Sequence, residues 1–274
     1  MKYPDNLFDH SIFNESAEIF GENIPFRYSH IKNVFTEEFY EKLHSKFIEL
    51  LSGGISDTFD MNKFSYFGQI TKETKYDAYS RVTDPNCNIT SIFYSNLWKN
   101  FISNLFPDIE LTVNSASSFH HHKVNSTSGF LHTDWNLQNF VKDELPNGIN
   151  PWYFQCKHAG EPGVDNAYQV VKSIACIYYL GNEEWNEGYG GDTGLYTHHN
   201  ENNFVKAIPY ENQIPYVKIP PVNNSMVVYE ISPYSYHGFI QNKKIERNAM
   251  IQWFYSNVSN RKDKYKNWKL NYNG

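Results

Sequence analysis

The chain has 274 residues, of which 40% are hydrophobic, 17% aromatic and 20% charged, and its formal net charge is −6. The apolar fraction excludes a disordered chain, and the lack of a long uninterrupted apolar run argues against a membrane-spanning segment. The negative charge disfavours a nucleic-acid-binding protein, since phosphate binding usually needs a basic face.

The cysteines are few and scattered. Cys87, Cys156 and Cys176 are an odd set with no CxxC pair, which predicts neither a disulfide framework nor a cysteine metal site. The N-terminal residues from Met1 contain no continuous apolar stretch. We therefore expect reduced thiols, no signal peptide and a cytoplasmic protein.

Two helices are predicted in the N-terminal part of the chain. The first follows the N-cap candidate Thr36 and carries apolar residues at helical spacing as far as Leu51. The second is expected to begin near Asn88 or Thr90, and its apolar stripe runs to Leu105.

The pattern changes after residue 107, where short strand-like runs alternate with Gly, Pro and Asn. The predicted strands are 110–124, 129–135, 168–180, 193–198, 215–219, 225–230, 236–240 and 247–257. Short strands with turn signals between them predict an antiparallel sandwich or barrel. Residues 141–167 form a long loop-like segment that carries Trp152, Tyr153 and Phe154. Because such long loops are usually functional, we expect this one to form a substrate wall.

The first candidate for chemistry is His132-Thr133-Asp134. On a strand, residues i and i+2 point to the same face, so an imidazole and a carboxylate would lie side by side. One more histidine would complete a 2-His-1-carboxylate triad, which binds Fe(II) and leaves coordination positions open. The pair alone is a weak indication, because any histidine-rich chain produces it by accident; the alternative is an ordinary strand with surface polar residues.

Two further candidates lie close to the end of the strand-rich region. His237 falls within a short predicted strand, and Arg247 follows ten residues later, at the start of the last strand. By alternation, Arg247 shares one face with Ala249, Ile251 and Trp253. If that face lines the barrel interior, the buried guanidinium needs an anionic partner, and a carboxylate matches its geometry. Otherwise Arg247 is a surface residue, and His237 a structural one.

The combination is more specific than its parts. An HxD pair, a distant histidine and an arginine about ten residues later resemble the Fe(II)/2-oxoglutarate dioxygenases. The segments Ile174-Ala-Cys-Ile-Tyr-Tyr-Leu and Gly190-Gly-Asp-Thr-Gly-Leu-Tyr, with the closing Arg247-x-Ala-x-x-x-Trp-Phe, are similar to the prolyl 4-hydroxylase group, especially to the oxygen-sensing prolyl hydroxylases. The resemblance covers residues 110–257.

The resemblance implies a mainly β fold, with a double-stranded β-helix core of the jelly-roll or cupin-like kind flanked by N-terminal α-helices. It implies a single domain over residues 1–274. Within it, residues 1–109 would be an arm and supporting helices, residues 110–257 the dioxygenase core and residues 258–274 a tail. The basic, aromatic stretch 261–269 of this tail is interpreted as a solvated terminal segment.

The resemblance also implies the roles of site residues. His132, Asp134 and His237 would ligate Fe(II), Arg247 would bind the distal carboxylate of 2-oxoglutarate, and Tyr179 would donate its hydroxyl to that carboxylate. The implied reaction is the hydroxylation of an unactivated C–H bond with O2, releasing succinate and CO2.

Other residues near these motifs have expected roles too. Tyr178 would pack on the face opposite to Tyr179, and Gly190 with Gly191 would form a turn beside the pocket. His120, His121 and His122 could suggest zinc, but a third ligand would be needed; we expect one or two of them to line the pocket and the rest to be solvated.

The substrate stays open at this stage. The resemblance favours a prolyl residue in a peptide or protein, but the segment before His132 differs from that of prolyl hydroxylases, and a free amino acid, a sugar or another small molecule would fit the same core. No nucleic-acid or membrane partner is expected. The alternatives are a cupin-type metal-dependent isomerase or hydrolase, and a non-catalytic jelly-roll binding module.

Overall fold

A computed structural model describes residues 7–8, 25–56, 67–69, 78–129, 131–141, 167–196, 214–265 and 271–272. The predictions for the aromatic residues of the 141–167 loop, Trp152, Tyr153 and Phe154, lie outside these residues. None of the helices in the described ranges is long and apolar enough to cross a membrane.

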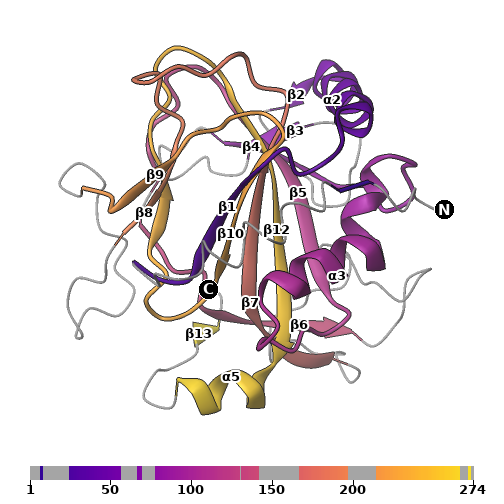
Figure 1. Ribbon diagram of the computed structural model, residues 1–274, viewed down its shortest axis with the longest axis vertical. Coiled ribbons are helices and arrows are strands. Elements are labelled where there is room, and N and C mark those ends of the chain that lie inside the picture. The colour runs from indigo at the N-terminus through magenta and orange to yellow at the C-terminus, as the bar shows by residue number, and fades with distance from the viewer. Residues whose placement is uncertain are drawn as a thin grey trace.

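Two β-sheets form the centre of the fold (Figure 1). The larger sheet contains, in spatial order, β1 (Tyr28–Lys32), β10 (Ser225–Glu230), β7 (Ala167–Tyr179), β12 (Arg247–Asn257), β5 (Ser115–His122), β4 (Tyr79–Val82), β3 (Phe67–Gln69) and β2 (Ile55–Ser56), with β6 (Asn136–Val141) beside β7 and β13 (Asn271–Tyr272) beside β6. The smaller sheet has the order β11 (His237–Phe239), β8 (Thr193–Leu195) and β9 (Val217–Ile219). The pairing is antiparallel except for β2 with β3 and β6 with β13. This mainly β, jelly-roll architecture confirms the predicted fold class.

Two layers of apolar side chains cover the two faces of the larger sheet. On one face, α2 (Glu37–Ser52) and α3 (Asn96–Leu105) pack through a large cluster that includes Phe47, Trp98 and Tyr178. Between the sheets, a second cluster includes Ile177 and Tyr179. Because successive side chains of a strand point to opposite faces, β7 contributes Tyr178 to one layer and its two neighbours to the other. The packing role predicted for Tyr178 is confirmed.

The first predicted helix is confirmed, whereas the second is wrong as a single element. A 3₁₀ helix, η1 (Thr90–Tyr94), and the separate helix α3 meet at Ser95, whose backbone is extended with φ −75° and ψ 152°. The Ser95 hydroxyl accepts a hydrogen bond from the backbone N–H of Trp98 at 3.1 Å. Serine is a favoured N-cap residue, so a new helix begins after Ser95. The apolar stripe seen in the sequence therefore spans two helices with a break between them.

The prediction of a solvated tail is wrong for Arg261 and Tyr265. Helix α5 (Val258–Lys264) follows β12, and Arg261 is only 3% exposed. Its Nη1 donates to the Glu230 carboxylate at 2.9 Å, and its Nη2 donates to the Ile231 carbonyl at 2.6 Å. The Tyr265 hydroxyl donates to the same carboxylate at 2.9 Å. A basic, aromatic sequence is therefore docked here because a buried glutamate lies at the end of β10.

The predicted strands after residue 107 are observed with small shifts, apart from two differences. Residues 129–135 form no strand within their described part, and β6 occupies residues 136–141, next to this range. The extent of the single domain, 1–274, and the cytoplasmic location stay predictions.

Candidate metal centre and cosubstrate pocket

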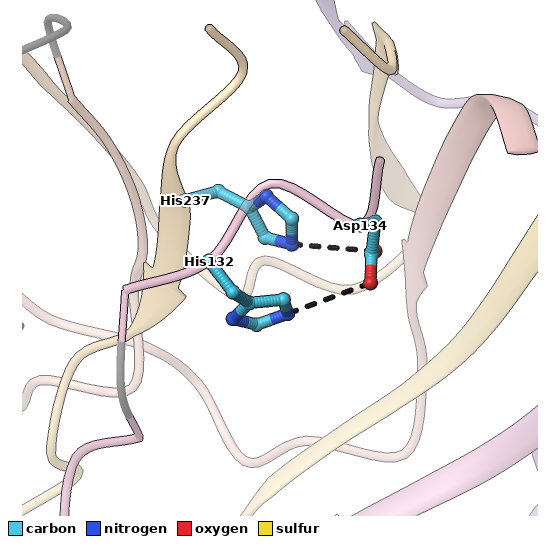
Figure 2. Close-up of side chains that lie close together, drawn as sticks. All are labelled: His132, Asp134 and His237. Atoms are coloured by element: carbon cyan, nitrogen blue, oxygen red, sulfur yellow. Dashed lines mark ion pairs between the residues drawn. The ribbon is translucent and has the colours of Figure 1, made fainter. Parts of the chain in front are cut away.

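His132, Asp134 and His237 converge at one point, as Figure 2 shows. The Nε2 atom of His132 lies 3.6 Å from Oδ1 of Asp134, and Nε2 of His237 lies 3.5 Å from Oδ2. One ligand atom from each residue fits within 4.8 Å of the other two. The side chain of His132 is 55% exposed while that of His237 is 7% exposed, so the group opens to solvent on the His132 side.

The backbone reaches this geometry in a different way from the strand alternation that we predicted. His132 forms an isolated antiparallel bridge with His237, in which each residue's N–H donates to the other's carbonyl. Two residues on, Asp134 has φ +56°, in the left-handed region. A non-glycine residue is strained there by about 1–3 kcal/mol, and such residues cluster at functional sites. A bridge and a turn therefore bring the carboxylate beside both imidazoles.

Two neighbours hold the Asp134 carboxylate. The indole Nε1 of Trp253 donates to Oδ2 at 2.8 Å, and the ammonium of Lys172 lies 3.6 Å from Oδ1. The same ammonium sits 4.2 Å from the centre of the Trp253 ring. Burial alone would raise the Asp134 pKa, but the Lys172 charge, with contributions from the neighbouring His132 and His237, holds this pKa well below its usual range. The carboxylate is therefore ionised and fixed in orientation.

His237 is oriented by its own chain. Its Nδ1 lies 3.0 Å from the carbonyl oxygen of Ser235. Since a carbonyl can only accept, Nδ1 carries the proton and the Nε2 lone pair faces Asp134 and His132. This second hydrogen bond is the usual way in which a metal-binding histidine is set in the correct tautomer.

A cavity of about 380 Å³ adjoins the three side chains. Its lining residues are His120, Gly129, His132, Asp134, Ile177, Thr193, Tyr229, His237, Gly238, Phe239, Arg247, Ile251 and Trp253. The cavity runs from the exposed His132 to Arg247, which is 2% exposed. Arg247, Ile251 and Trp253 all line it, so this face of β12 is the interior one, as the sequence argument required.

Arg247 is a buried cation with no ion-pair partner among the described residues, although the buried Asp192 is near enough for the two charges to interact. Its Nη2 donates to the Thr193 hydroxyl at 3.2 Å, and its guanidinium lies 5.3 Å from the Tyr179 ring and 5.4 Å from the Phe239 ring. No carboxylate forms an ion pair with Arg247 in the part of the chain that the structure describes, and its Nε has no hydrogen-bond partner there. A buried charge without a counterion is unfavourable, so the site is suited to an anionic ligand.

Tyr179 lies beside Arg247, as predicted. Its hydroxyl is 2.7 Å from the Thr193 hydroxyl, which also accepts from Arg247. Burial raises the Tyr179 pKa, with a smaller opposing effect of the Arg247 charge, so the phenol stays protonated and able to donate.

Gly190 and Gly191 form the predicted turn before β8, with φ +74° and +83°. A Cβ on Gly190 would overlap the carbonyl oxygen of Gln241, and a Cβ on Gly191 would lie 3.4 Å from Cγ of Arg247. Gly190 is required because of its positive φ and because a side chain there would overlap Gln241. At Gly191, the absence of a side chain lets the turn lie against Arg247.

The three consecutive histidines are all buried, so the expectation that some are solvated is wrong. His120 lines the cavity, with Nε2 2.9 Å from the Ser118 hydroxyl. His122, on the same face, stacks on Phe239 at 4.2 Å between ring centres. His121 points to the other face, where its Nδ1 lies 2.8 Å from Oδ1 of Asn248. Paired strands on both sides of β5 cover these polar residues, which a local pattern does not reveal.

Sequence reasoning missed Lys172, Thr193 and Tyr229 as site residues. The signal for Lys172 was a single charge in the middle of the apolar run 168–180. Thr193 and Tyr229 carried no separate signal, because strand residues of these types are ordinary.

Comparisons with known proteins concern the family and the fold. Residues 152–255 match the family model of the 2OG-Fe(II) oxygenase superfamily, a range that contains Tyr179, His237 and Arg247 but not His132 and Asp134. This match favours a dioxygenase over the isomerase, hydrolase and binding-module alternatives.

Solved structures of prolyl hydroxylases share the fold. A prolyl-4-hydroxylase from Pseudomonas putida superimposes with a TM-score of 0.55 at 11% identity, covering 89% of this chain and 97% of that one. A prolyl hydroxylase from Trichoplax adhaerens, in complex with a hypoxia inducible factor oxygen degradation domain peptide fragment, gives 0.55 at 13% identity and covers 94% of each chain. Residues 152–255 thus match the 2OG-Fe(II) oxygenase superfamily, whose members use Fe(II), 2-oxoglutarate and O2, and the chain has the fold of the prolyl hydroxylases.

Proposed function

We propose that the chain hydroxylates an unactivated C–H bond of a prolyl residue in a peptide or protein, using Fe(II) held by His132, Asp134 and His237. The observation that carries the proposal is the placement of two imidazoles and one carboxylate within 4.8 Å of one another, beside a cavity whose buried end holds Arg247, which has no ion-pair partner among the described residues.

The donor set fits Fe(II). Two imidazole nitrogens and one carboxylate form the facial set of non-haem Fe(II) oxygenases, which leaves positions for other ligands. Asp134 is ionised and held by Trp253 and Lys172, and His237 presents its Nε2 lone pair. A metal therefore meets a carboxylate that is already ionised and side chains that are already oriented, which favours binding.

The cavity suits 2-oxoglutarate. Arg247 offers a guanidinium that lacks a counterion among the described residues, and Tyr179 offers a hydroxyl beside it, so the distal carboxylate would sit between them. Ile177, Phe239 and Ile251 make the remaining wall apolar and exclude water.

When bound, Fe(II) with 2-oxoglutarate and O2 would supply the oxidising chemistry for the C–H bond, and 2-oxoglutarate would be converted to succinate and CO2. The protein's part is to hold and orient the reactants. The exposed edge of His132 marks the side from which a substrate would approach.

The choice of a prolyl substrate is supported by the fold alone. Both structural neighbours described above are prolyl hydroxylases, and one was solved with a peptide. Turnover of a free amino acid or a sugar would change the proposed substrate class.

The test begins without oxygen. Fe(II) and 2-oxoglutarate added to the anaerobic protein should produce the weak visible charge-transfer band of a chelated 2-oxo acid. Arg247→Ala should lose the band at the same 2-oxoglutarate concentration, and Asp134→Ala should lose it at any concentration.

The substrate is then identified by succinate release with prolyl peptides, free amino acids and sugars. Absence of the band in folded wild-type protein would overturn the cofactor assignment. Succinate release that depends on a sugar or a free amino acid, with none for peptides, would overturn the prolyl assignment.

A further inference from the structure

The buried end of the cavity contains a residue that the cosubstrate site described so far does not use. We propose that His120 binds 2-oxoglutarate together with Arg247, through its imidazole Nδ1 and the distal carboxylate. This inference rests on the proposed function and adds a third donor to that subsite.

The sheet register places the two side chains on one face. β5 pairs antiparallel with β12, with His122 opposite Arg247 and His120 opposite Ala249. His120 and Arg247 are therefore diagonal neighbours, close enough for long side chains to meet the same ligand. Ala249 has only a methyl group, so nothing on its position fills the space beside the imidazole. Both His120 and Arg247 line the cavity.

Each of the two residues has one unused polar atom. Nε2 of His120 is 2.9 Å from the Ser118 hydroxyl, but its Nδ1 is buried with no partner in the described part of the chain. The Nε of Arg247 is in the same state. Native proteins rarely leave buried polar atoms unpaired, so two of them at one end of one cavity point to a ligand with several acceptor sites. A carboxylate has about four.

The chemistry of the imidazole agrees with a donor role. Burial, with a smaller effect of the Arg247 charge, lowers the His120 pKa to about 3, so the ring is neutral. The proposed role requires the Ser118 hydroxyl to be the donor to Nε2, which places the single ring proton on Nδ1. A neutral donor adds a hydrogen bond to the carboxylate without placing a second positive charge beside Arg247.

His121 provides a matched control. It is the next residue on the same strand and is 1% exposed, but it lies on the opposite face against Asn248. His121→Phe should therefore leave the affinity for 2-oxoglutarate unchanged, whereas His120→Leu should weaken it.

The experiment measures the dissociation constant of 2-oxoglutarate by anaerobic calorimetry on the Mn(II)-loaded protein. Loss of a hydrogen bond to a charged group corresponds to roughly tenfold weaker binding or more for His120→Leu. His120→Asn keeps a donor near the position of Nδ1 and should stay within about threefold of wild type. His120→Gln has its amide nearer the position of Nε2 and should behave like the leucine variant.

A second ligand separates the role in binding from a general effect on the metal site. 2-Oxovalerate has the same chain length and the same chelating 2-oxo acid, but a methyl group replaces the distal carboxylate. Its affinity should not change in His120→Leu. Equal weakening of both ligands, or an unchanged 2-oxoglutarate affinity, would overturn the role of His120. If folded wild-type protein binds no 2-oxoglutarate, the proposed function itself fails, and the two failures are thereby distinguished.

Discussion

Replacing Trp253 with phenylalanine should weaken metal binding while leaving the fold intact. The variant removes the indole N–H that donates to Asp134 at 2.8 Å but keeps an aromatic ring beneath the Lys172 ammonium. A hydrogen bond to a charged group contributes about 1.5–3 kcal/mol, which corresponds to about 10- to 150-fold in an equilibrium constant. Because the bond exists before the metal binds, this energy is an upper limit, and we expect about tenfold weaker binding.

The reason for the loss is the orientation of the carboxylate. Asp134 stands at φ +56°, and the Trp253 bond holds Oδ2 while leaving Oδ1 near His132. Without the indole donor, the carboxylate rotates more freely and must be reoriented when the metal arrives. Effects of about 10- to 100-fold are typical for residues that orient metal ligands.

The assay is anaerobic calorimetry with Co(II), a redox-stable substitute for Fe(II), supported by the visible absorption of the bound ion. Trp98→Phe is the control, because it removes another buried indole hydrogen bond, to Gln252 at 2.7 Å, on the face of β12 opposite to Trp253. The control should lower the free energy of unfolding without changing the dissociation constant of Co(II). A folded Trp253→Phe protein that binds Co(II) within twofold of wild type would refute the reasoning.

Three further predictions concern stability. Arg261→Met leaves the Glu230 carboxylate without its buried cation and should lower the free energy of unfolding by about 3–5 kcal/mol in urea titrations. Lys264→Met, which removes an exposed partner of the same carboxylate, should lower it by less than about 1 kcal/mol, and equal losses would contradict the argument. Burial raises the Glu230 pKa, but the Arg261 and Lys264 charges and the Tyr265 hydrogen bond together outweigh this and keep the folded-state pKa below the ordinary 4.5. The stabilisation that ionised Glu230 contributes is therefore complete above about pH 4.5 and is lost as the pH falls through the folded-state pKa. In Glu230→Gln, the free energy of unfolding should fall less steeply as the pH is lowered through this range. An unchanged slope would contradict this. Gly190→Ala should lower the melting temperature, since an alanine at φ +74° costs about 1–2 kcal/mol before its overlap with Gln241 is counted, and a melting temperature equal to wild type would exclude the strain.

Much of the β-architecture is predictable because it depends on local pattern. Alternation in 168–180 and 247–257 correctly indicates two strands, and it puts Arg247 on the cavity side together with Trp253. The candidate site residues were likewise found from order and spacing along the chain. Their convergence required the HxD pair and His237, which are about a hundred residues apart, to be brought together by the folded chain.

Local pattern fails where one side chain changes the backbone or a distant residue supplies the partner. The apolar stripe of the second helix says nothing of the break at Ser95, where a hydroxyl caps a new helix. The basic tail reads as solvated because its partner Glu230 lies 31 residues before Arg261. Periodicity indicates which face of a helix or strand a residue occupies, but not whether that face contacts solvent or another part of the chain.

The sequence by itself indicated the fold class, the order of the candidate ligands and the strand face that Arg247 shares with Ile251 and Trp253. Only the tertiary structure decided how Asp134 is aimed, through a left-handed backbone and contacts from β7 and β12, and that His120 reaches the same cavity as Arg247. The physical reason is that strand periodicity is encoded over neighbouring residues, whereas the hydrogen bonds, charges and packing that orient a carboxylate come from strands brought together by folding.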